Sequence, residues 1–217
     1  MHIQTNFRDA TAGHQRYGDP ALPALLAQVR PSAVTLYAEN AVIYAQGEAA
    51  GPLYLVEFGT VRICRITADG RRQISAFHFA GEVFGFEVDS EHHFYAESVD
   101  GAGVRALRPA SGETLADKVL PLALRSLVRA QEHLLVLGRQ SACEKMAAFL
   151  LDLAARQETD RFVDLSMQRM DIADYLGLTF ETVSRVLHKL KDAGVIALPS
   201  TKQIELLDIE ALEELGG

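Results

Sequence analysis

Three polar side chains, Glu181, Ser184 and Arg185, stand close together near the C-terminus of the chain. In a helix, residues three and four apart lie on one face, so these side chains would project together. Arginine can donate to O6 and N7 of guanine, glutamate can accept from N4 of cytosine, and serine can contact either kind of group. The set therefore predicts hydrogen bonding to base edges in a DNA major groove.

A simpler interpretation of Glu181 and Arg185 is a solvent-exposed salt bridge along the helix, worth about 0.3 to 0.5 kcal/mol. The pair alone does not exclude it. The flanking sequence is therefore needed to distinguish base reading from an isolated salt bridge.

The segment that carries these side chains has the pattern of a helix-turn-helix. Counting Arg169 as position one, Ala173 is fifth, Gly177 ninth, and Val183 and Val186 fifteenth and eighteenth. The small residue lets the helices cross, the glycine suits the backbone of the turn, and the valines lock the helices together. The remaining apolar residues of the inner faces are Ile172, Leu176, Leu178, Leu187 and Leu190. With the whole motif in register, we favour base reading over the isolated salt bridge.

The flanking residues predict contacts with the DNA backbone. Thr179 can cap the second helix. Residues 179–191 contain three positive side chains and one negative, a local charge of +2 (three minus one). The stretch GVIALPSTKQIELL predicts a two-stranded wing that turns at Pro199 to Lys202. Phosphate contacts are expected from Thr179, Thr182, Lys189 and Lys202.

The composition agrees with a globular chain whose DNA contacts are local. The chain has 217 residues, 48% of them apolar, and a formal net charge of -8. This acidic balance argues against a surface covered in positive charge, so DNA binding requires a patch. The start lacks a basic segment followed by an apolar run, and no later run approaches the ~20 residues that cross a bilayer. We expect a cytoplasmic protein without a membrane contact.

Residues 31–107 contain short apolar or alternating runs that are broken by glycine, a pattern of short antiparallel strands. The run boundaries carry Gly47, Gly51, Gly59, Gly70, Gly81 and Gly85. Turns often need a positive φ that glycine reaches without strain. We expect hairpins that close into a roll, although a sandwich would have similar turns.

After this region, the stretch LPLALRSLVRAQEHLLVLGRQ predicts an amphipathic helix of about 19 residues, with Pro121 in its first turn. Its apolar stripe could pack on the β-domain of its own chain or on the same helix of a second subunit, and the pattern leaves both open. The residues assigned to dimerisation are Leu120, Leu124, Leu127, Gln131 and Leu134. A second helical run follows Gln140, so residues 138–141 are the expected hinge.

From about Val42 to Leu212 the chain resembles the Crp/Fnr superfamily of bacterial transcription regulators. The roll glycines, the GEVFGFE segment, the long helix and the ETVSR segment occur in family order. The FixK type of Alphaproteobacteria is the most similar branch, above all in GRRQISAFHFAGEVFGFE, RAQEHLLVLGRQ and DIADYLGLTFETVSR. The resemblance implies an α+β fold with an N-terminal cyclic-nucleotide-binding-like β-roll, a long dimerisation helix and a C-terminal winged helix-turn-helix.

On this basis we divide the chain into a flexible arm (1–20), a sensor-like β-roll (21–110), a dimerisation helix region (111–139) and a DNA-binding domain (140–217). The resemblance implies a homodimer on a palindrome of the TTGAT-N4-ATCAA type, because a two-fold protein requires two-fold DNA. Glu181, Ser184 and Arg185 match the family's base-reading positions. Activation by contact with RNA polymerase is implied, for genes of low-oxygen respiration or nitrogen metabolism. A repressor stays open, since the sign depends on where the box lies.

The family's usual signals are not supported by this sequence. Cyclic-nucleotide members carry an arginine and a small hydroxyl residue after the GE segment, whereas residues 81–98 here contain no Lys or Arg. Instead Glu87, Asp89, Glu91 and Glu97 would repel a phosphate. The oxygen-sensing branch needs four cysteines, most near the N-terminus, where this chain has none. We expect neither cyclic nucleotide nor iron–sulfur cluster nor any other cofactor.

Other sensing chemistries stay open as alternatives. Cys143 begins a helix, where the dipole can lower a thiol pKa, and Cys64 lies in a strand beside arginines, so either could be a redox switch. Haem-based sensing of nitric oxide through a histidine is a further alternative. His92 and His93 would point to opposite faces of a strand, so we expect no metal site there.

A β-barrel metalloenzyme is the remaining rival of a different class. It would need a histidine and carboxylate cluster that the spacings do not supply, and it leaves the helix-turn-helix unexplained. No nucleophile with a base and no phosphate-binding loop is evident either. We therefore expect a protein that is not an enzyme.

Overall fold

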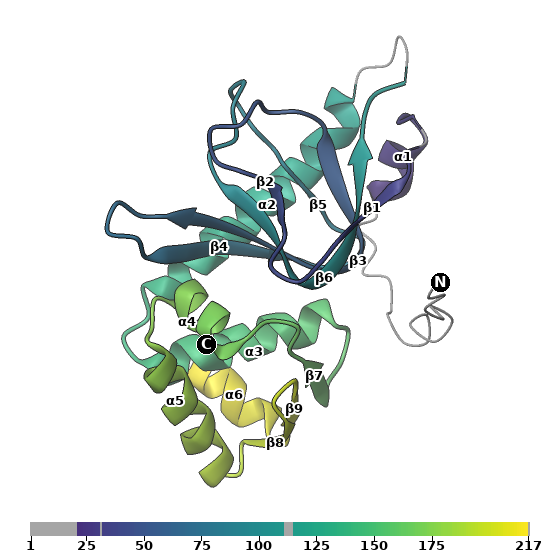
Figure 1. The fold of residues 1–217 in the computed structure, drawn as a ribbon. Coiled ribbons are helices and arrows are strands. Elements are labelled where there is room, and N and C mark those ends of the chain that lie inside the picture. Colours follow the sequence, from purple (N-terminus) through teal and green to yellow (C-terminus); the bar gives the residue numbers. More distant parts are fainter. Residues whose placement is uncertain (1–20, 31, 111–114, 217) are drawn as a thin grey trace, which may run out of the picture.

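The computed structural model describes residues 21–30, 32–110 and 115–216, so the arm expected at 1–20 lies outside the described residues. The first half forms α1 (Leu22–Leu26), β1 (Val34–Tyr37), β2 (Val42–Tyr44), β3 (Leu53–Ile66), β4 (Arg72–His78), β5 (Val83–Phe84) and β6 (Tyr95–Leu107). The second half forms α2 (Ala116–Leu137), α3 (Ala142–Arg156), β7 (Phe162–Asp164), α4 (Arg169–Leu176), α5 (Phe180–Asp192), β8 (Ile196–Ser200), β9 (Gln203–Leu206) and α6 (Ile209–Gly216). Figure 1 shows a β-roll above a small helical domain.

The β-roll is antiparallel throughout, with strands in the order β1-β6-β3-β4, while β2 pairs with β6 and β5 pairs with β3. The long strands β3 and β6 form its centre, in a register that places Val56 opposite Val104. Both valines are buried in the interior of the roll, together with Phe84. The expected α+β architecture with an N-terminal roll is confirmed.

One expected turn is wrong, because β3 runs without interruption through Gly59. Gly59 has φ +78°, and the pairing of β3 with β6 shifts register around it. A Cβ at this position would lie 2.1 Å from the carbonyl oxygen of Gly101 on β6. The glycine therefore serves a bulge where two backbones approach closely. A glycine that ends an apolar run in the sequence does not distinguish these two uses.

The long helix begins earlier than its pattern indicated. Helix α2 has 22 residues, and Pro121 lies inside it instead of in its first turn. The additional turn is stabilised by packing, because Leu115 and Val119 contact the cluster of buried side chains that includes Leu25 and Leu107. Helix ends depend on such tertiary contacts as well as on the local sequence.

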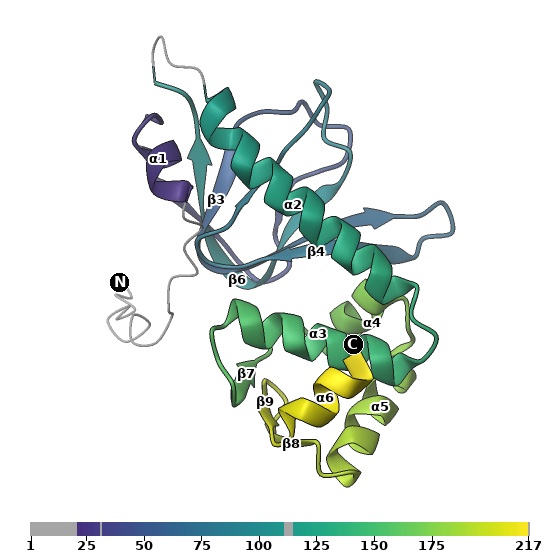
Figure 2. The same ribbon diagram turned by 180° about the vertical axis from the view of Figure 1, so that it is seen from behind.

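Helix α2 crosses one face of the roll and leads down to the helical domain (Figure 2). Residues 138–141 then connect it to α3, whose first turn is capped by Ser141, with the hydroxyl accepting from the N–H of Glu144 at 3.1 Å. The roll and the helical domain share one hydrophobic core, which includes Phe77 of β4, Phe149 of α3 and Ile172 of α4. In the described part of the chain, no helix has the length and apolar character needed to cross a membrane.

Candidate nucleic-acid interface

Helix α5 is fixed at its start by the residue that the sequence assigned as its cap. Thr179 has an extended backbone, and its hydroxyl accepts from the N–H of Thr182 at 3.2 Å. The helix carries Glu181 in its first turn and Lys189 and Lys191 in its last turn, which suits the helix dipole at both ends. Its inner face consists of buried Val183, Val186, Leu187 and Leu190.

The preceding helix and turn also match the predicted motif. Ala173 is buried where α4 meets α5, and Ile172 and Leu176 lie in the same core. Gly177 ends α4 in the left-handed conformation with φ +63°. This conformation is unfavourable for a residue with a Cβ, whereas glycine adopts it without strain. Helix α4, the turn and α5 therefore form a helix-turn-helix.

The outer face of α5 carries the three predicted base-reading residues. Glu181 and Arg185 are exposed, and Ser184 is partly buried. The guanidinium of Arg185 donates to the hydroxyl of Thr182 at 3.4 Å, and no ion pair joins Arg185 to Glu181 among the described residues. The backbone N–H of Glu181 itself and the Thr179 hydroxyl hold the pKa of Glu181 below its ordinary value, which favours the ionised carboxylate as an acceptor.

Two residues of this face were not foreseen from the sequence. Arg169, at the start of α4, donates to the hydroxyl oxygen of Ser184 at 3.3 Å. His188 is exposed one turn beyond Ser184, and its Nδ1 lies 2.7 Å from the Ser184 carbonyl oxygen. His188 follows Glu181 by seven residues and Arg185 by three, so helical spacing could have placed it on the same face. Arg169 could be found only from the folded helix pair.

Of the four residues predicted to contact phosphate, three belong to α5 or its cap, namely Thr179, Thr182 and Lys189, and Lys202 belongs to the wing. Lys189 is exposed on α5, and exposed Lys202 lies in the turn between β8 and β9, at the tip of the wing. The hydroxyls of Thr179 and Thr182 lie 3.1 Å apart and bond each other, so their first role is to cap the helix. Their contacts with DNA stay predictions, as do those of the lysines.

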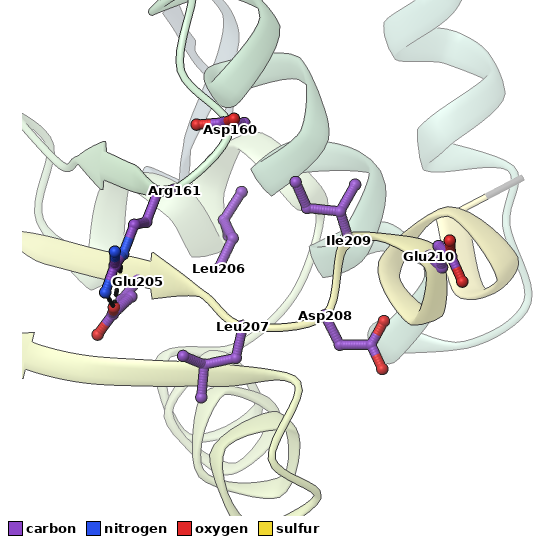
Figure 3. A pocket seen from close by; sticks show the side chains of 8 residues that line it. All are labelled: Asp160, Arg161, Glu205, Leu206, Leu207, Asp208, Ile209 and Glu210. Carbon is purple, nitrogen blue, oxygen red and sulfur yellow. Dashed lines mark hydrogen bonds and ion pairs between the residues drawn. The ribbon is translucent and has the colours of Figure 1, made fainter.

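On another side of the domain there is an open pocket of about 560 Å³, formed by the end of β9 and the start of α6 (Figure 3). It is lined by Asp160, Arg161, Glu205, Leu206, Leu207, Asp208, Ile209 and Glu210. Arg161 pairs with Glu205 at 2.8 Å, which leaves the lining with an excess of carboxylates. Since carboxylates repel phosphate, the DNA backbone is not expected at this pocket.

The two cysteines differ in their surroundings. Burial, with a contribution from Glu97, raises the pKa of Cys64 to about 12, so its reactive thiolate form is disfavoured. Cys143 is the second residue of α3 and is only partly buried. A redox role therefore stays a prediction, with Cys143 the better candidate.

The expectation that His92 and His93 point to opposite faces is wrong. Neither residue lies in a strand, and both Nδ1 atoms contact the carboxylate of Glu87, at 3.1 and 2.8 Å. His92 also stacks on Tyr44 with ring centroids 3.6 Å apart. Within the described ranges, no group of three or more His, Cys, Asp or Glu side chains is arranged to hold a metal ion.

A cavity of about 380 Å³ lies between the roll and α2. Its walls include the aromatic rings of Tyr44, Phe77, Phe84, Phe86, Phe94 and Tyr175. Two arginines, Arg129 of α2 and Arg156 of α3, also reach it, which the sequence did not predict. Both pair with the buried carboxylate of Glu82 at 2.9 Å.

Comparison with known proteins gives a consistent result for both halves of the chain. Residues 34–99 match the model of the cyclic nucleotide-binding domain, and residues 144–215 match that of the Crp-like helix-turn-helix domain. The nitrogen fixation regulation protein FixK of Rhizobium meliloti (strain 1021) is 47% identical over 185 residues, which cover 85% of this chain and 88% of that protein. The chain belongs to the Crp/Fnr family.

Within the family, the similarity is to the FixK type. The FixK protein of Azorhizobium caulinodans is 43% identical, over 83% of this chain and 77% of that protein. The solved structure of FixK2 from Bradyrhizobium japonicum superposes with a TM-score of 0.80 at 37% identity, covering 87% of this chain and 98% of that chain. The chain is thus a DNA-binding transcription regulator of the FixK type, and these relatives are regulators, not enzymes.

Proposed function

We propose that this regulator binds a TTGAT-N4-ATCAA-like palindrome as a homodimer, with Glu181, Ser184 and Arg185 reading bases in each half-site. The observation that carries the proposal is the open face of α5, where an ionised glutamate and a guanidinium held by Thr182 stand one helical turn apart. Arginine suits guanine and glutamate suits cytosine, so the pair fits a G·C base pair within the half-site.

The dimer is proposed from the outer stripe of α2. Leu120, Leu124, Leu127 and Leu134 are between 51% and 66% exposed, and Gln131 is exposed among them. The opposite side of the helix is occupied, because Leu122 and His133 are buried against the rest of the chain. The roll of the same chain leaves the stripe largely exposed, although Leu127 also lines the cavity between the roll and α2, and this exposure supports a second subunit as the partner. An exposed apolar stripe of this kind is typical of a protein interface.

We further propose that binding needs neither cyclic nucleotide nor iron–sulfur cluster. Residues 81–98 supply no cation for a phosphate, and Glu82 engages the two arginines of the neighbouring cavity. The regions assigned to these roles are the roll (21–110), the dimerisation helix region (111–139) and the DNA-binding domain (140–217). Activation through RNA polymerase, at genes of low-oxygen respiration or nitrogen metabolism, completes the proposal. The two FixK relatives, which are named as nitrogen fixation regulation proteins, support its nitrogen-metabolism part.

The test is fluorescence-anisotropy binding of purified, reduced, metal-free protein to the box duplex and to a scrambled duplex, without effector and at one stated salt concentration. The expected result is tight binding to the box and weak binding to the scrambled duplex. Equal affinity for the two duplexes would contradict the proposed base readout.

A further inference from the structure

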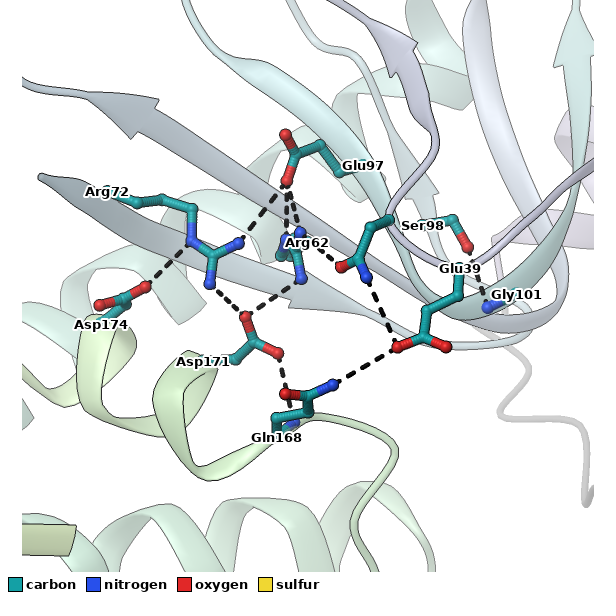
Figure 4. A network of polar contacts seen from close by, with 10 residues as sticks. Glu39, Arg62, Arg72, Glu97, Ser98, Gly101, Gln168, Asp171 and Asp174 are labelled. Atoms are coloured by element: carbon teal, nitrogen blue, oxygen red, sulfur yellow. Dashed lines mark hydrogen bonds and ion pairs between the residues drawn. The ribbon is translucent and has the colours of Figure 1, made fainter. Parts of the chain in front are cut away.

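The N-terminal end of α4 is tied to the β-roll by a network of charged side chains (Figure 4). Asp171, in the first turn of α4, accepts from Arg62 of β3 at 3.1 Å and from Arg72 of β4 at 2.6 Å through one carboxylate oxygen. Its other oxygen accepts from the N–H of Gln168 at 3.2 Å. One carboxylate therefore both caps α4 and joins it to two strands of the roll.

Neighbouring carboxylates hold both arginines in place. Glu97 of β6 accepts from Nε of Arg62 at 2.8 Å, and Asp174 of α4 accepts from Nε of Arg72 at 2.9 Å. The side chains of Arg62 and Asp171 are only 5% and 4% exposed, so salt screens this pair little. Removing one partner of such a pair leaves a buried charge uncompensated.

The other end of α4 is held by aromatic contacts. The ring of Tyr175 stacks on His133 of α2, with centroids 3.8 Å apart and planes 6° from parallel. His133 Nε2 also lies 2.9 Å from the Tyr175 carbonyl oxygen, and Phe77 of β4 meets the same ring at 5.2 Å. Helix α4 is thus attached at both ends: its N-terminal end contacts the roll, and its C-terminal end contacts α2 and β4.

Because α4 packs directly on α5 through the shared core, a fixed α4 also fixes the direction of α5. Figure 1 shows α4 next to β4, and α5 on the side of α4 away from the roll. We propose that Arg62 and Arg72 are positioning residues for DNA reading, which hold the helix-turn-helix in its binding orientation without a ligand. This inference rests on the proposed function.

A regulator that a ligand switches has two orientations of its DNA-binding domain within a few kcal/mol of each other. Here the ion pairs of two arginines with three carboxylates, together with the shared hydrophobic core, join the domains in one orientation. These side chains are Arg62, Arg72, Glu97, Asp171 and Asp174. Losing part of the network lets the helix-turn-helix spend time in other orientations. The affinity for specific DNA is then reduced in proportion to the fraction of molecules that are correctly oriented.

The experiment replaces Arg72, because its side chain is 27% exposed and its loss is better tolerated than that of buried Arg62. Arg72→Ala, Arg72→Lys and the control Arg71→Ala are titrated with the box duplex, and both Kd and the DNA-binding fraction of the protein are fitted. Arg71 is the adjacent residue, 85% exposed, and pairs with Asp69 at the hairpin tip.

We expect Arg72→Ala to raise Kd for the box about tenfold, equal to about 1.4 kcal/mol, at an unchanged binding fraction. Arg72→Lys should give an intermediate value, because an ammonium lacks the planar fork that reaches two carboxylates. Arg71→Ala should bind like the wild type, and binding to the scrambled duplex should change little in all three. A double-mutant cycle combines Arg72→Ala with Asp174→Ala. Because the two side chains act through the same ion pair, the double variant should bind the box no more weakly than the single variant with the higher Kd.

Other outcomes have distinct meanings. A lower binding fraction with an unchanged Kd indicates a purely structural role and overturns the inference. Wild-type affinity in every variant, or tighter binding in Arg72→Ala, also overturns it. If the wild type itself fails to distinguish the box from the scrambled duplex, the proposed function fails first, so the two failures are distinguishable.

Discussion

At the scale of single residues, the candidate interface is pre-oriented by its neighbours. Arg169 donates to the hydroxyl oxygen of Ser184, so the proton of that hydroxyl stays free to be donated. Ser184 is therefore expected to contact an acceptor on a base edge, such as thymine O4. Arg185 is held by Thr182 in a similar way, which lowers the entropy lost when the guanidinium meets DNA.

Arg185→Ala is predicted to weaken binding to the box by about tenfold to a hundredfold, since a bidentate arginine contact is worth about 1 to 3 kcal/mol. Binding to scrambled DNA should fall much less. The matched variant Lys189→Ala should weaken both complexes and reduce the slope of log K against log salt by about 1. Anisotropy titrations over a salt series measure both affinities and the salt slope. An equal loss of affinity for the box and for scrambled DNA in Arg185→Ala would refute base reading by this residue.

Glu82 is predicted to make stability sensitive to acid. Burial opposes its ionisation, but Arg156, together with His78 and Arg129, lowers its pKa from 4.5 to about 2. A carboxyl group with a depressed folded pKa stabilises the fold above its unfolded pKa and loses that contribution as pH falls through its folded pKa. The melting temperature should therefore drop between about pH 5 and pH 2.

The pH dependence can be assigned with two variants. The drop in melting temperature should be smaller in Glu82→Gln than in the wild type, even though this variant is less stable near neutral pH. Exposed Glu91 is the control, and Glu91→Gln should follow the wild-type slope. An identical slope in all three proteins would mean that Glu82 is not the responsible group.

At the scale of elements, the helix-turn-helix depends on one backbone conformation. Gly177 ends α4 with φ +63°, while a Cβ at this position would meet only Leu137 Cδ2, at an ordinary 3.7 Å. The requirement for glycine is therefore conformational and not steric. It permits the sharp change of direction that brings Thr179 to the start of α5.

Gly177→Ala is predicted to destabilise the protein by about 1 to 2 kcal/mol, the cost of a left-handed conformation in an L-residue. Gly138→Ala is the matched control, because Gly138 has φ -76° and a Cβ there meets nothing closer than 3.5 Å. That change should be neutral or stabilising by up to about 1 kcal/mol. Denaturant unfolding gives the free energy of unfolding of each variant. An equal loss of stability in the two variants would contradict the prediction.

At the scale of the whole molecule, the described residues form one helix-turn-helix, whereas the proposed palindrome would offer two half-sites. The uncovered stripe on α2 and the tight attachment of α4 to the roll are two parts of one arrangement. The stripe would set the distance between two subunits, and the network around Asp171 would set the direction of each recognition helix.

Leu124→Glu is predicted to give a monomer, because a carboxylate at a buried subunit interface loses its hydration. Its affinity for the full box should fall strongly, while the melting temperature of the monomer stays measurable. Leu36→Glu is the control, since Leu36 is an exposed leucine on β1 and not on α2. Sedimentation velocity reports the state of each protein, and a dimeric Leu124→Glu variant would show that the interface lies elsewhere.

The sequence by itself determined the elements whose signals are local. The positions of Ala173, Gly177, Thr179 and Val183 predicted the helix-turn-helix, because caps, turn conformations and helical periodicity depend on residues a few positions apart. The same local reasoning gave the wing and the long helix. It failed for the start of α2 and for Gly59, where packing against distant residues decides the conformation.

Only the tertiary structure decided which distant side chains meet. Arg62 and Asp171 are 109 residues apart, and His92 and His93 converge on Glu87 although their adjacency suggested opposite directions. The burial that raises the pKa of Cys64 and the exposure of the α2 stripe likewise arise only when the chain is folded. Such features depend on the packing of whole elements, because no short stretch of sequence contains both partners of the contact.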